Sequence, residues 1–367
     1  MKFKLHHVFR SPAFVACAAV AVVFMAAGCA STSKKSGLAK HSFYPAPPDE
    51  PRVQFLTSYQ SSADFPKTGS GKFMTFLTGK TDGVMMINKP YGGAAGKGTI
   101  HVCDTASGAV MRLHLAEKKM DAIIGTGAAN FVSPLNMAVD EDGSMYVVDM
   151  GVNQLIVVDK DENLAGVVGE KDAMKPMDVA LSKDRIYLSD VKSHSVHVLD
   201  KATRKALFDI PRAEDAANIT NKLFQPINIA LDSQGRLYVS DFGASRVQVY
   251  DADGKYLHTI GGKGDNYGEF TRPKGVAVDR DNRVYVVDAA GQMVQVFDST
   301  GHLLMWFGEP SKDRVSLFLP AKVLVDYDDV ALFQKYAAPN FQLEHLLIVL
   351  NQYGPMKVSV FGFGHKK

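Results

Sequence analysis

The 367-residue chain carries 41 basic and 39 acidic side chains, which gives a net charge of +2 at pH 7. Residues 1–28 hold three of the basic residues and no acidic ones, so the remainder has 38 basic and 39 acidic residues. A nearly neutral domain has no electrostatic footprint for nucleic acid, and we exclude nucleic acid as a partner.

The first 28 residues predict a lipoprotein signal peptide. Lys2, Lys4 and Arg10 precede an apolar stretch, residues 13–25, that is too short for an ordinary transmembrane helix. The sequence AAGC that follows resembles the lipobox of bacterial lipoproteins, with Cys29 as the lipidated first residue of the mature protein. The alternatives are an ordinary secretory signal with an incidental cysteine, or cleavage before Cys17. Two or more acyl chains would anchor the protein on a membrane without spanning it.

The residues after Cys29 predict the destination and a spacer. Ala30, where inner-membrane lipoproteins have Asp, favours the outer membrane by resemblance to Gram-negative lipoproteins. Residues 29–50 are rich in Ser, Lys and Pro and predict a flexible tether. We therefore expect a single folded domain over residues 51–367.

A repeat that begins with proline runs through this domain. The repeats start at Pro90, Pro134, Pro176, Pro226, Pro273 and Pro320. Their spacing of 42 to 50 residues is typical of four-stranded propeller blades. Each repeat contains an apolar first strand, an Asp/Gly turn, a strand rich in β-branched and aromatic residues, and two further strands. The sequence therefore predicts an all-β, six-bladed β-propeller, whose blades bury their faces against one another.

The sixth repeat differs from the others. An insertion, roughly residues 327–344, separates its first two strands, and Asn351 stands where the other repeats have Asp. The chain ends before a fourth strand. We expect the segment PRVQFLTSY, residues 51–59, to supply that strand and so to close the ring with the two ends of the chain.

The repeat pattern P-x-[GN]-[IV]-A-[VL]-D…[LV]-Y-V-x-D…V-x-V-[FY]-D resembles the NHL repeat. Together with AAGC and the segment PPDEPRVQFL, it resembles bacterial six-bladed NHL-type propeller lipoproteins. The resemblance covers nearly the whole mature chain and is sharpest in the second to fifth repeats. It implies the fold and a role in binding or assembly in the cell envelope, but it implies no activity, because one scaffold hosts many functions.

The central channel is the first candidate site. The residues two positions after each proline should ring one mouth of it: Gly92, Asn136, Asp178, Asn228, Gly275 and Lys322. Oxygens of Asn136, Asp178 and Asn228 could bind calcium or another divalent metal, and the same groups could bind a small polar ligand. The alternative is that these side chains satisfy one another, neighbouring backbone or channel water.

A second set of polar residues recurs once in each blade. Asp104, Asp149, Asp190, Asp241 and Asp288 end the second strand of their repeats, where we expect them to cap backbone donors. The loops after them differ from blade to blade and should share a face with the channel mouth, as a binding surface does. We select Phe242, Arg246 and His194 in these loops as candidate ligand-binding residues.

The remaining cysteine and histidine residues do not predict a further site. Cys103 is expected to be a buried strand residue, and His197 is expected to diverge from His194 and not to share a metal with it. No G-x-S-x-G, H-E-x-x-H or Cys-x-x-Cys motif is present. The sequence favours a membrane-anchored scaffold that binds an envelope protein, peptide or ligand and has no certain cofactor. The alternative is a metal-dependent propeller hydrolase or lyase whose channel site includes Asp178.

Overall fold

A computed structural model describes residues 41–65, 83–125, 130–170, 173–214 and 218–367. The predicted signal peptide, Cys29 and residues 29–40 of the predicted tether lie outside these ranges. Among the described residues, the helices are all too short to cross a membrane.

Six antiparallel sheets, one for each predicted repeat, form the domain. The first three blades contain β3 (Pro90–Gly96), β4 (Thr99–Asp104), β5 (Ala109–His114) and β6 (Lys119–Ile123); β7 (Pro134–Val139), β8 (Met145–Asp149), β9 (Gln154–Val158) and β10 (Leu164–Val168); and β11 (Pro176–Leu181), β12 (Arg185–Asp190), β13 (Ser195–Asp200) and β14 (Ala206–Ile210). The next two contain β15 (Pro226–Leu231), β16 (Leu237–Asp241), β17 (Arg246–Tyr250) and β18 (Tyr256–Ile260); and β19 (Pro273–Val278), β20 (Val284–Asp288), β21 (Met293–Phe297) and β22 (Leu303–Phe307).

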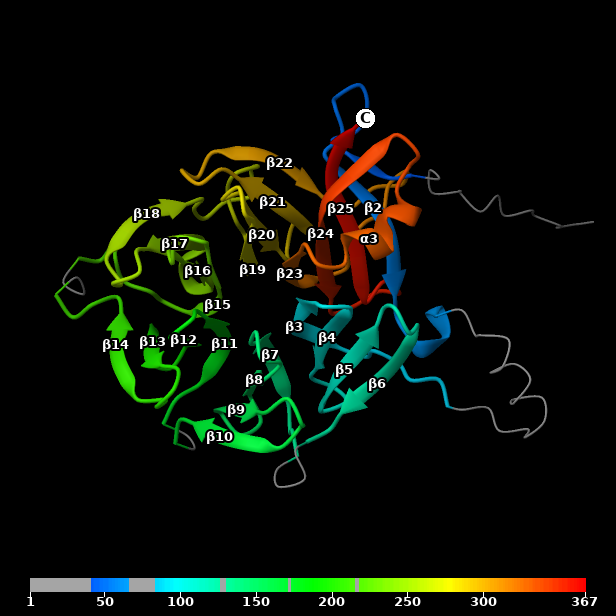
Figure 1. The fold of residues 1–367 in the computed structure, drawn as a ribbon. Helices are drawn as coiled ribbons and strands as arrows, with labels where there is room; N and C mark the ends of the chain where they lie inside the picture. The colour runs from blue at the N-terminus through cyan, green and yellow to red at the C-terminus, as the bar shows by residue number, and fades with distance from the viewer. Residues whose placement is uncertain (1–40, 66–82, 126–129, 171–172, 215–217) are drawn as a thin grey trace, which may run out of the picture. The chain divides into compact units, whose positions relative to one another are not determined.

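The sixth blade combines the two ends of the chain. It contains β23 (Pro320–Asp326), β24 (Phe341–Asn351), β25 (Val358–Lys366), β2 (Val53–Tyr59) and β1 (Phe43–Tyr44), in the order β1-β2-β25-β24-β23. The first strand of each blade contacts the first strand of the next, and β23 contacts β3, so the six blades close a ring around a central channel (Figure 1). The predicted six-bladed propeller is confirmed.

Blade packing supplies the hydrophobic core. Six clusters of buried side chains occur, and each combines residues from two neighbouring blades. Between the third and fourth blades, for example, Val198 and Tyr187 pack with Val239 and Tyr250, and all four are buried. Full burial of an aliphatic side chain of this size stabilises the fold by about 1.5–3 kcal/mol. Because every cluster needs two blades, no blade could bury its apolar faces alone.

The recurrent aspartates cap the backbone that precedes each proline. Pro226 pairs with Asp241, and the Asp241 carboxylate accepts hydrogen bonds from the backbone nitrogens of Phe224 at 2.8 Å and Gln225 at 2.9 Å. Such a pair of bonds satisfies buried donors that the sheet leaves unpaired. Equivalent bonds of 2.6–3.0 Å occur at Asp104, Asp149, Asp190 and Asp288. The predicted architectural role agrees with this geometry.

Strand β2 fills the fourth position of the sixth blade, as predicted. It pairs antiparallel with β25, from Val53 opposite Phe363 to Tyr59 opposite Val358. Asn351 replaces the usual Asp and still accepts a hydrogen bond, from the backbone nitrogen of Phe318 at 3.0 Å. The closing strand therefore joins residues about 300 positions apart in the sequence.

Two features of this blade differ from the predictions. Residues 41–50 belong to the fold and not to a flexible tether, because β1 pairs with β2 and Tyr44 is fully buried beside Phe307 and Phe361. Burial of the aromatic side chain of Tyr44 holds this segment in the fold, although its polar composition suggested a spacer. The insertion is also shorter than predicted, because β24 already begins at Phe341. It contains α3 (Val330–Phe333) and a 3₁₀ turn, η3 (Gln334–Tyr336).

The two ends of the channel differ, and we name them for what they carry. At the proline end lie the six repeat prolines, the loops between the second and third strands and the connections between blades. Backbone bonds such as Met150 N to Ser133 O and Phe242 N to Gln225 O hold these loops together. At the opposite end, the turn end, lie the turns between the first and second strands and between the third and fourth.

Candidate functional site

Four of the six channel positions come together inside the ring. The Lys322 ammonium nitrogen lies 2.5 Å from Asp178 Oδ2 and 3.2 Å from Asn228 Oδ1. Asn136 Nδ2 lies 3.5 Å from the same Asn228 oxygen and donates to the Met177 carbonyl at 2.8 Å. We call Asn136, Asp178, Asn228 and Lys322 the channel cluster. All four side chains are buried, so they close the channel and do not ring an open mouth as predicted.

The cluster is built around the Asp178 carboxylate. Besides Lys322, the carboxylate accepts hydrogen bonds from the backbone nitrogens of Val179 at 2.9 Å and Ile229 at 3.0 Å. Burial raises the pKa of Asp178, while the charge and hydrogen bond of Lys322 act in the opposite direction. Because the ammonium and the carboxylate are both taken out of water, each depends on the other for charge compensation.

Glycines at the remaining two positions make room for the cluster. A Cβ atom on Gly92 would lie 1.6 Å from Asn136 Oδ1, and one on Gly275 would lie 2.6 Å from the Lys322 Cα. Glycine is therefore required sterically at both positions. Asn136 Oδ1 and Asn228 Nδ2 are buried without a hydrogen-bond partner among the described residues.

The arrangement does not fit the predicted metal site. A divalent cation needs several oxygen ligands, including carboxylates, and the single carboxylate of the cluster already pairs with Lys322. No group of three or more His, Cys, Asp or Glu side chains suited to a metal occurs in the described part of the chain. The signal that sequence reasoning missed was the charge of Lys322, which occupies the same repeat position as Asp178 and lies across the ring from it.

Beyond the cluster, the side chains that line the channel are small or aliphatic. A cavity of 280 Å³ is lined by residues four positions after the prolines, namely Ala94, Ala138, Ala180, Ala230 and Ala277, together with neighbouring apolar residues of the inner strands. Lys322 is the only charged residue that lines it. This part of the channel offers no pair of titratable groups for acid–base chemistry.

The three loop residues selected from the sequence lie at the proline end, apart from the channel cluster. His194 is exposed, with φ of 55°, and Phe242 is half-buried in a 3₁₀ turn, η2 (Phe242–Ala244). Arg246 is held internally, because its Nη2 donates to the Lys222 carbonyl at 2.6 Å and its Nε lies 3.3 Å from Asp241 Oδ2. Arg246 therefore supports the loop structure, whereas His194 and part of Phe242 face solvent.

The neighbouring His197 forms a polar network of its own. Its Nδ1 lies 2.7 Å from Asp209 Oδ1 and its Nε2 lies 3.2 Å from Asp190 Oδ2. The hydrogen bond to Asp190, followed by that to Asp209, raises the pKa of His197. Ser193 Oγ lies 3.4 Å from His197 Nε2 but also 2.9 Å from Asp190 Oδ2. Because carboxylates engage both ring nitrogens, His197 cannot act as a base toward this hydroxyl.

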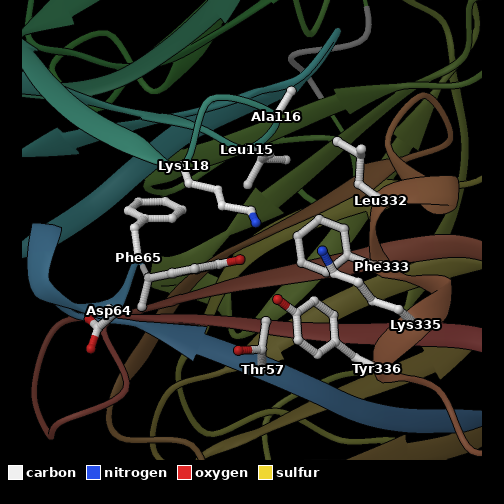
Figure 2. A pocket seen from close by; sticks show the side chains of 11 residues that line it. Thr57, Asp64, Phe65, Leu115, Ala116, Lys118, Leu332, Phe333, Lys335 and Tyr336 are labelled. Carbon is white, nitrogen blue, oxygen red and sulfur yellow. The ribbon is translucent and has the colours of Figure 1, made fainter. Parts of the chain in front are cut away.

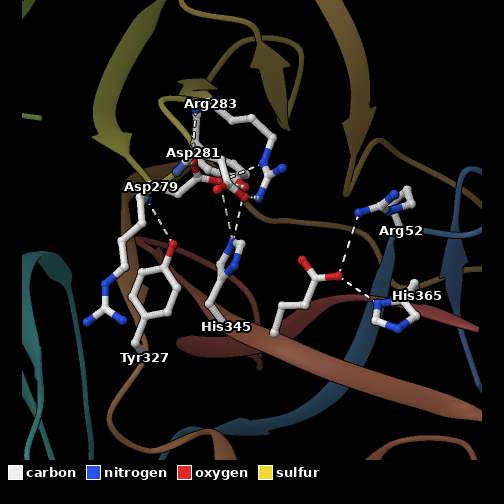
Figure 3. A network of polar contacts seen from close by, with 10 residues as sticks. Arg52, Asp279, Asp281, Arg283, Tyr327, His345 and His365 are labelled. Atoms are coloured by element: carbon white, nitrogen blue, oxygen red, sulfur yellow. Dashed lines mark hydrogen bonds and ion pairs between the residues drawn. The ribbon is translucent and has the colours of Figure 1, made fainter. Parts of the chain in front are cut away.

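A second buried histidine lies between the fifth and sixth blades (Figure 3). His345 Nε2 lies 3.1 Å from the Tyr285 hydroxyl, which donates to Asp279 Oδ2 at 2.8 Å, and the same oxygen accepts from Arg283 Nε at 2.6 Å. Burial lowers the pKa of His345 to about 4. The His345 ring stacks on Phe363 at 4.8 Å. Sequence reasoning missed this network, which joins two blades. Its Arg283 and the adjoining Phe363 also line a pocket of 240 Å³.

The rim of the channel at the proline end is basic. None of the loops between second and third strands contains Asp or Glu, nor do the two residues that precede each proline. The rim instead carries Lys89, Lys175, Arg272, Lys274 and Lys357. None of these five forms an ion pair with another described residue. Burial, with Arg272 and Lys89 nearby, lowers the pKa of Lys274 to about 8. The rim therefore carries five basic side chains that form no ion pair among the described residues, although the connections between blades at the same end contain carboxylates such as Glu170, Asp265 and Glu309.

Exposed apolar side chains gather at the same end. Among the described residues, five such side chains lie on outer strands and one, Tyr336, lies in the insertion. The other nine lie in proline-end loops and connections: Val84, Met86, Ile124, Val132, Met150, Ile219, Phe224, Tyr267 and Tyr353. The turns at the opposite end carry none apart from Tyr336. One face of the propeller therefore combines a basic rim with exposed apolar side chains, which are features of a binding surface.

Comparison with known proteins supports the fold. The model of the DUF5128 family, described as a 6-bladed beta-propeller, matches residues 220–307, which include the fourth and fifth blades. No curated protein matches the sequence significantly.

Several solved structures are similar in fold at low sequence identity. A protein of unknown function from Bacteroides thetaiotaomicron VPI-5482 has a TM-score of 0.55 at 16% identity, covering 85% of this chain and 75% of that one. A gluconolactonase from Xanthomonas campestris has a TM-score of 0.53 at 16% identity, covering 86% and 98%. A streptogramin B lyase has a TM-score of 0.53 at 10% identity, covering 75% and 94%. The chain is a six-bladed β-propeller, similar in fold to both enzymes and proteins without a known activity.

Proposed function

We propose that this protein is an exported, lipid-anchored NHL-type propeller of the bacterial outer membrane that binds an acidic envelope protein or peptide through its proline end. The observation that carries the proposal is the asymmetry of the ring. The rim at the proline end combines basic side chains that form no ion pair among the described residues with exposed apolar ones, and the buried channel cluster lies behind it.

The charge of the rim specifies the kind of partner. Lys274 is half-buried and lies 5.2 Å from the centre of the Tyr91 ring, and its one hydrogen bond among the described residues is to Gln352 Oε1 at 3.1 Å. A carboxylate of a partner would compensate this ammonium and favour its charged form. Apolar side chains such as Met150 and Phe224 around the rim would supply contact area, while the charges would steer association.

The channel cluster supports binding over metal-dependent catalysis. A hydrolase or lyase of that kind would need the Asp178 carboxylate as a ligand, but Lys322 already occupies the place of the cation. The lactonase and lyase propellers of similar fold are too distant in sequence to transfer an activity to this chain. We therefore propose only the binding role.

The first test concerns the rim charges. In cells, a photo-crosslinker at position 150 should capture a partner through the proline end, whereas one at position 202, at the turn end, should not. Replacing Arg272 and Lys274 together with Glu should reduce this capture about tenfold or more, because like charges slow association. Purified proteins should show the same loss, and it should be smaller at high salt.

The matched control replaces two exposed turn-end lysines, Lys183 and Lys255, with Glu and should leave capture unchanged. Charge reversal in the acidic segment of the captured partner should restore binding to the Arg272→Glu, Lys274→Glu variant. If capture from position 150 survives reversal of the rim charges, or if both positions capture equally, the proposed surface is wrong.

The second test concerns the anchor. Cys29→Ala should leave an unlipidated precursor or a mis-sorted protein, because the acyl chains on Cys29 would provide the membrane attachment. Membrane fractionation and mass spectrometry of the mature N-terminus measure this. The anchor would be contradicted if wild-type protein were processed normally but recovered from the soluble periplasm without acyl mass. That result would not bear on the proposed binding face.

A further inference from the structure

A pocket lies at the seam where the ring closes, and its lining includes no residue of the channel cluster. Its volume is 120 Å³. Strand β2 and the residues after it form one wall, the turn between β5 and β6 of the first blade forms another, and the insertion with α3 and η3 forms the third (Figure 2). Three segments from distant parts of the sequence therefore meet around one space, which we call the seam pocket.

Four of the eleven residues that line the seam pocket are aromatic. Tyr59 and Phe65 stack with ring centroids 5.0 Å apart, and Phe333 and Tyr336 lie 6.0 Å apart across from the first blade. Leu115 from the turn between β5 and β6 adds an aliphatic surface. Such walls suit a compact apolar or aromatic group, since flat rings pack well against one another.

The polar groups of the seam pocket are predominantly positive. Figure 2 shows the ammonium groups of Lys118 and Lys335 and the hydroxyl of Tyr336 turned toward the same space. Neither lysine forms an ion pair within the described part of the chain. The one acidic residue of the lining, Asp64, is turned away, and its carboxylate accepts hydrogen bonds from the backbone nitrogens of Gln60 at 2.6 Å and Ser61 at 2.7 Å. Two lysines thus lack a local counter-charge.

We propose that the seam pocket binds a small organic anion with a single carboxylate on a compact apolar body. The lysines and the Tyr336 hydroxyl would hold the carboxylate, and the aromatic walls would hold the apolar part. At 120 Å³ the pocket is somewhat smaller than an engineered cavity of about 150 Å³ that binds benzene, so it would enclose at most one small ring, with the carboxylate toward the exposed Lys118 and Lys335. A bound anion would link β2, the first blade and the insertion, and would therefore stabilise the closed ring.

Benzoate, benzamide and inorganic phosphate are the three probes. Calorimetry and thermal unfolding of the full chain should show saturable binding of benzoate with a raised melting temperature. Benzamide, which has the same shape without the charge, should bind at least about tenfold more weakly, because a hydrogen bond to a charged group contributes more than one to a neutral group. Phosphate, which has no apolar part, should also bind more weakly.

Two substitutions test the assigned residues. Lys118→Ala and Lys335→Ala should each weaken benzoate binding about tenfold and leave the melting temperature of the ligand-free protein nearly unchanged, because both side chains are exposed. The matched control is Lys255→Ala, since Lys255 directly precedes the outer strand of the fourth blade as Lys118 does in the first; this variant should bind as the wild type does.

Any of three results would overturn the proposal. The first is that benzoate does not bind. The second is that benzamide or phosphate binds as tightly as benzoate. The third is that Lys255→Ala weakens benzoate binding as much as Lys118→Ala does. Because the probes act at the seam, the outcome is independent of whether the proline end binds a partner, and the rim variants should bind benzoate normally.

Discussion

Deletion of residues 52–59 is expected to abolish the cooperative folding of the whole propeller, not only of the sixth blade. The deletion removes β2, which includes the buried side chains Val53, Leu56 and Tyr59. It would expose Phe361 and Val360 of β25 and leave the backbone edge of that strand unpaired. Loss of several buried apolar side chains exceeds the net stability of many domains. Circular dichroism, thermal unfolding and size-exclusion chromatography would show a non-cooperative transition and aggregation.

A peptide added in trans separates the loss of this strand from a general effect of truncation. A synthetic peptide of residues 41–60 should restore a cooperative transition, because it supplies both β1 and β2 to the free edge of β25. A peptide of the same composition with scrambled order is the control. Closure by β2 would not be essential if the truncated protein remained soluble and melted cooperatively at the wild-type temperature.

Asp178→Ala is expected to destabilise the protein by about 3–5 kcal/mol, because it leaves the buried Lys322 ammonium without its partner. The double variant Asp178→Ala, Lys322→Met should recover most of that loss, since a buried ion pair can often be replaced by apolar side chains at little cost. Guanidinium unfolding of the single and double variants in a mutant cycle measures the coupling between the two side chains.

The variant Lys322→Met provides the control through its pH dependence. Burial already raises the pKa of Asp178 in the native protein, and removal of Lys322 takes away a group that lowers it. When folding raises the pKa of a carboxyl group, the native state is favoured while that group is protonated. The variant should therefore lose stability as the pH rises above the pKa of Asp178 in the unfolded chain, about 3.9. Stability that is independent of pH between 4 and 8 in this variant would show that the pair is not coupled as described.

The same variants address the channel directly. Wild-type protein should melt at the same temperature with calcium, with zinc and with chelator, because Lys322 compensates the only carboxylate of the channel cluster. An increase of several degrees with either metal, abolished by Asp178→Ala, would restore the metal-dependent hydrolase or lyase as a candidate and would count against the binding scaffold.

The number of blades, the residues of the inner strands and the need for a closing strand follow from the amino-acid sequence. These properties are local and periodic. A proline cannot donate to the sheet, so it marks the first residue of an inner strand, and an Asp about fifteen residues later caps the two donors before it. Alternating apolar residues define the strands between them. The missing fourth strand of the last repeat then identified residues 51–59, because an open edge is unfavourable.

The way in which side chains from different blades meet depends on closure of the ring. Asp178 and Lys322 are 144 positions apart, and only the closed ring brings their atoms together and turns a predicted metal ligand into half of an ion pair. Tyr44 belongs to the fold because Phe307 and Phe361 cover it, which the composition of residues 29–50 does not reveal. The seam pocket likewise exists only where three distant segments converge. Local patterns specify strands, whereas contacts across the channel and the seam depend on the curvature and closure of the ring, which no single repeat encodes.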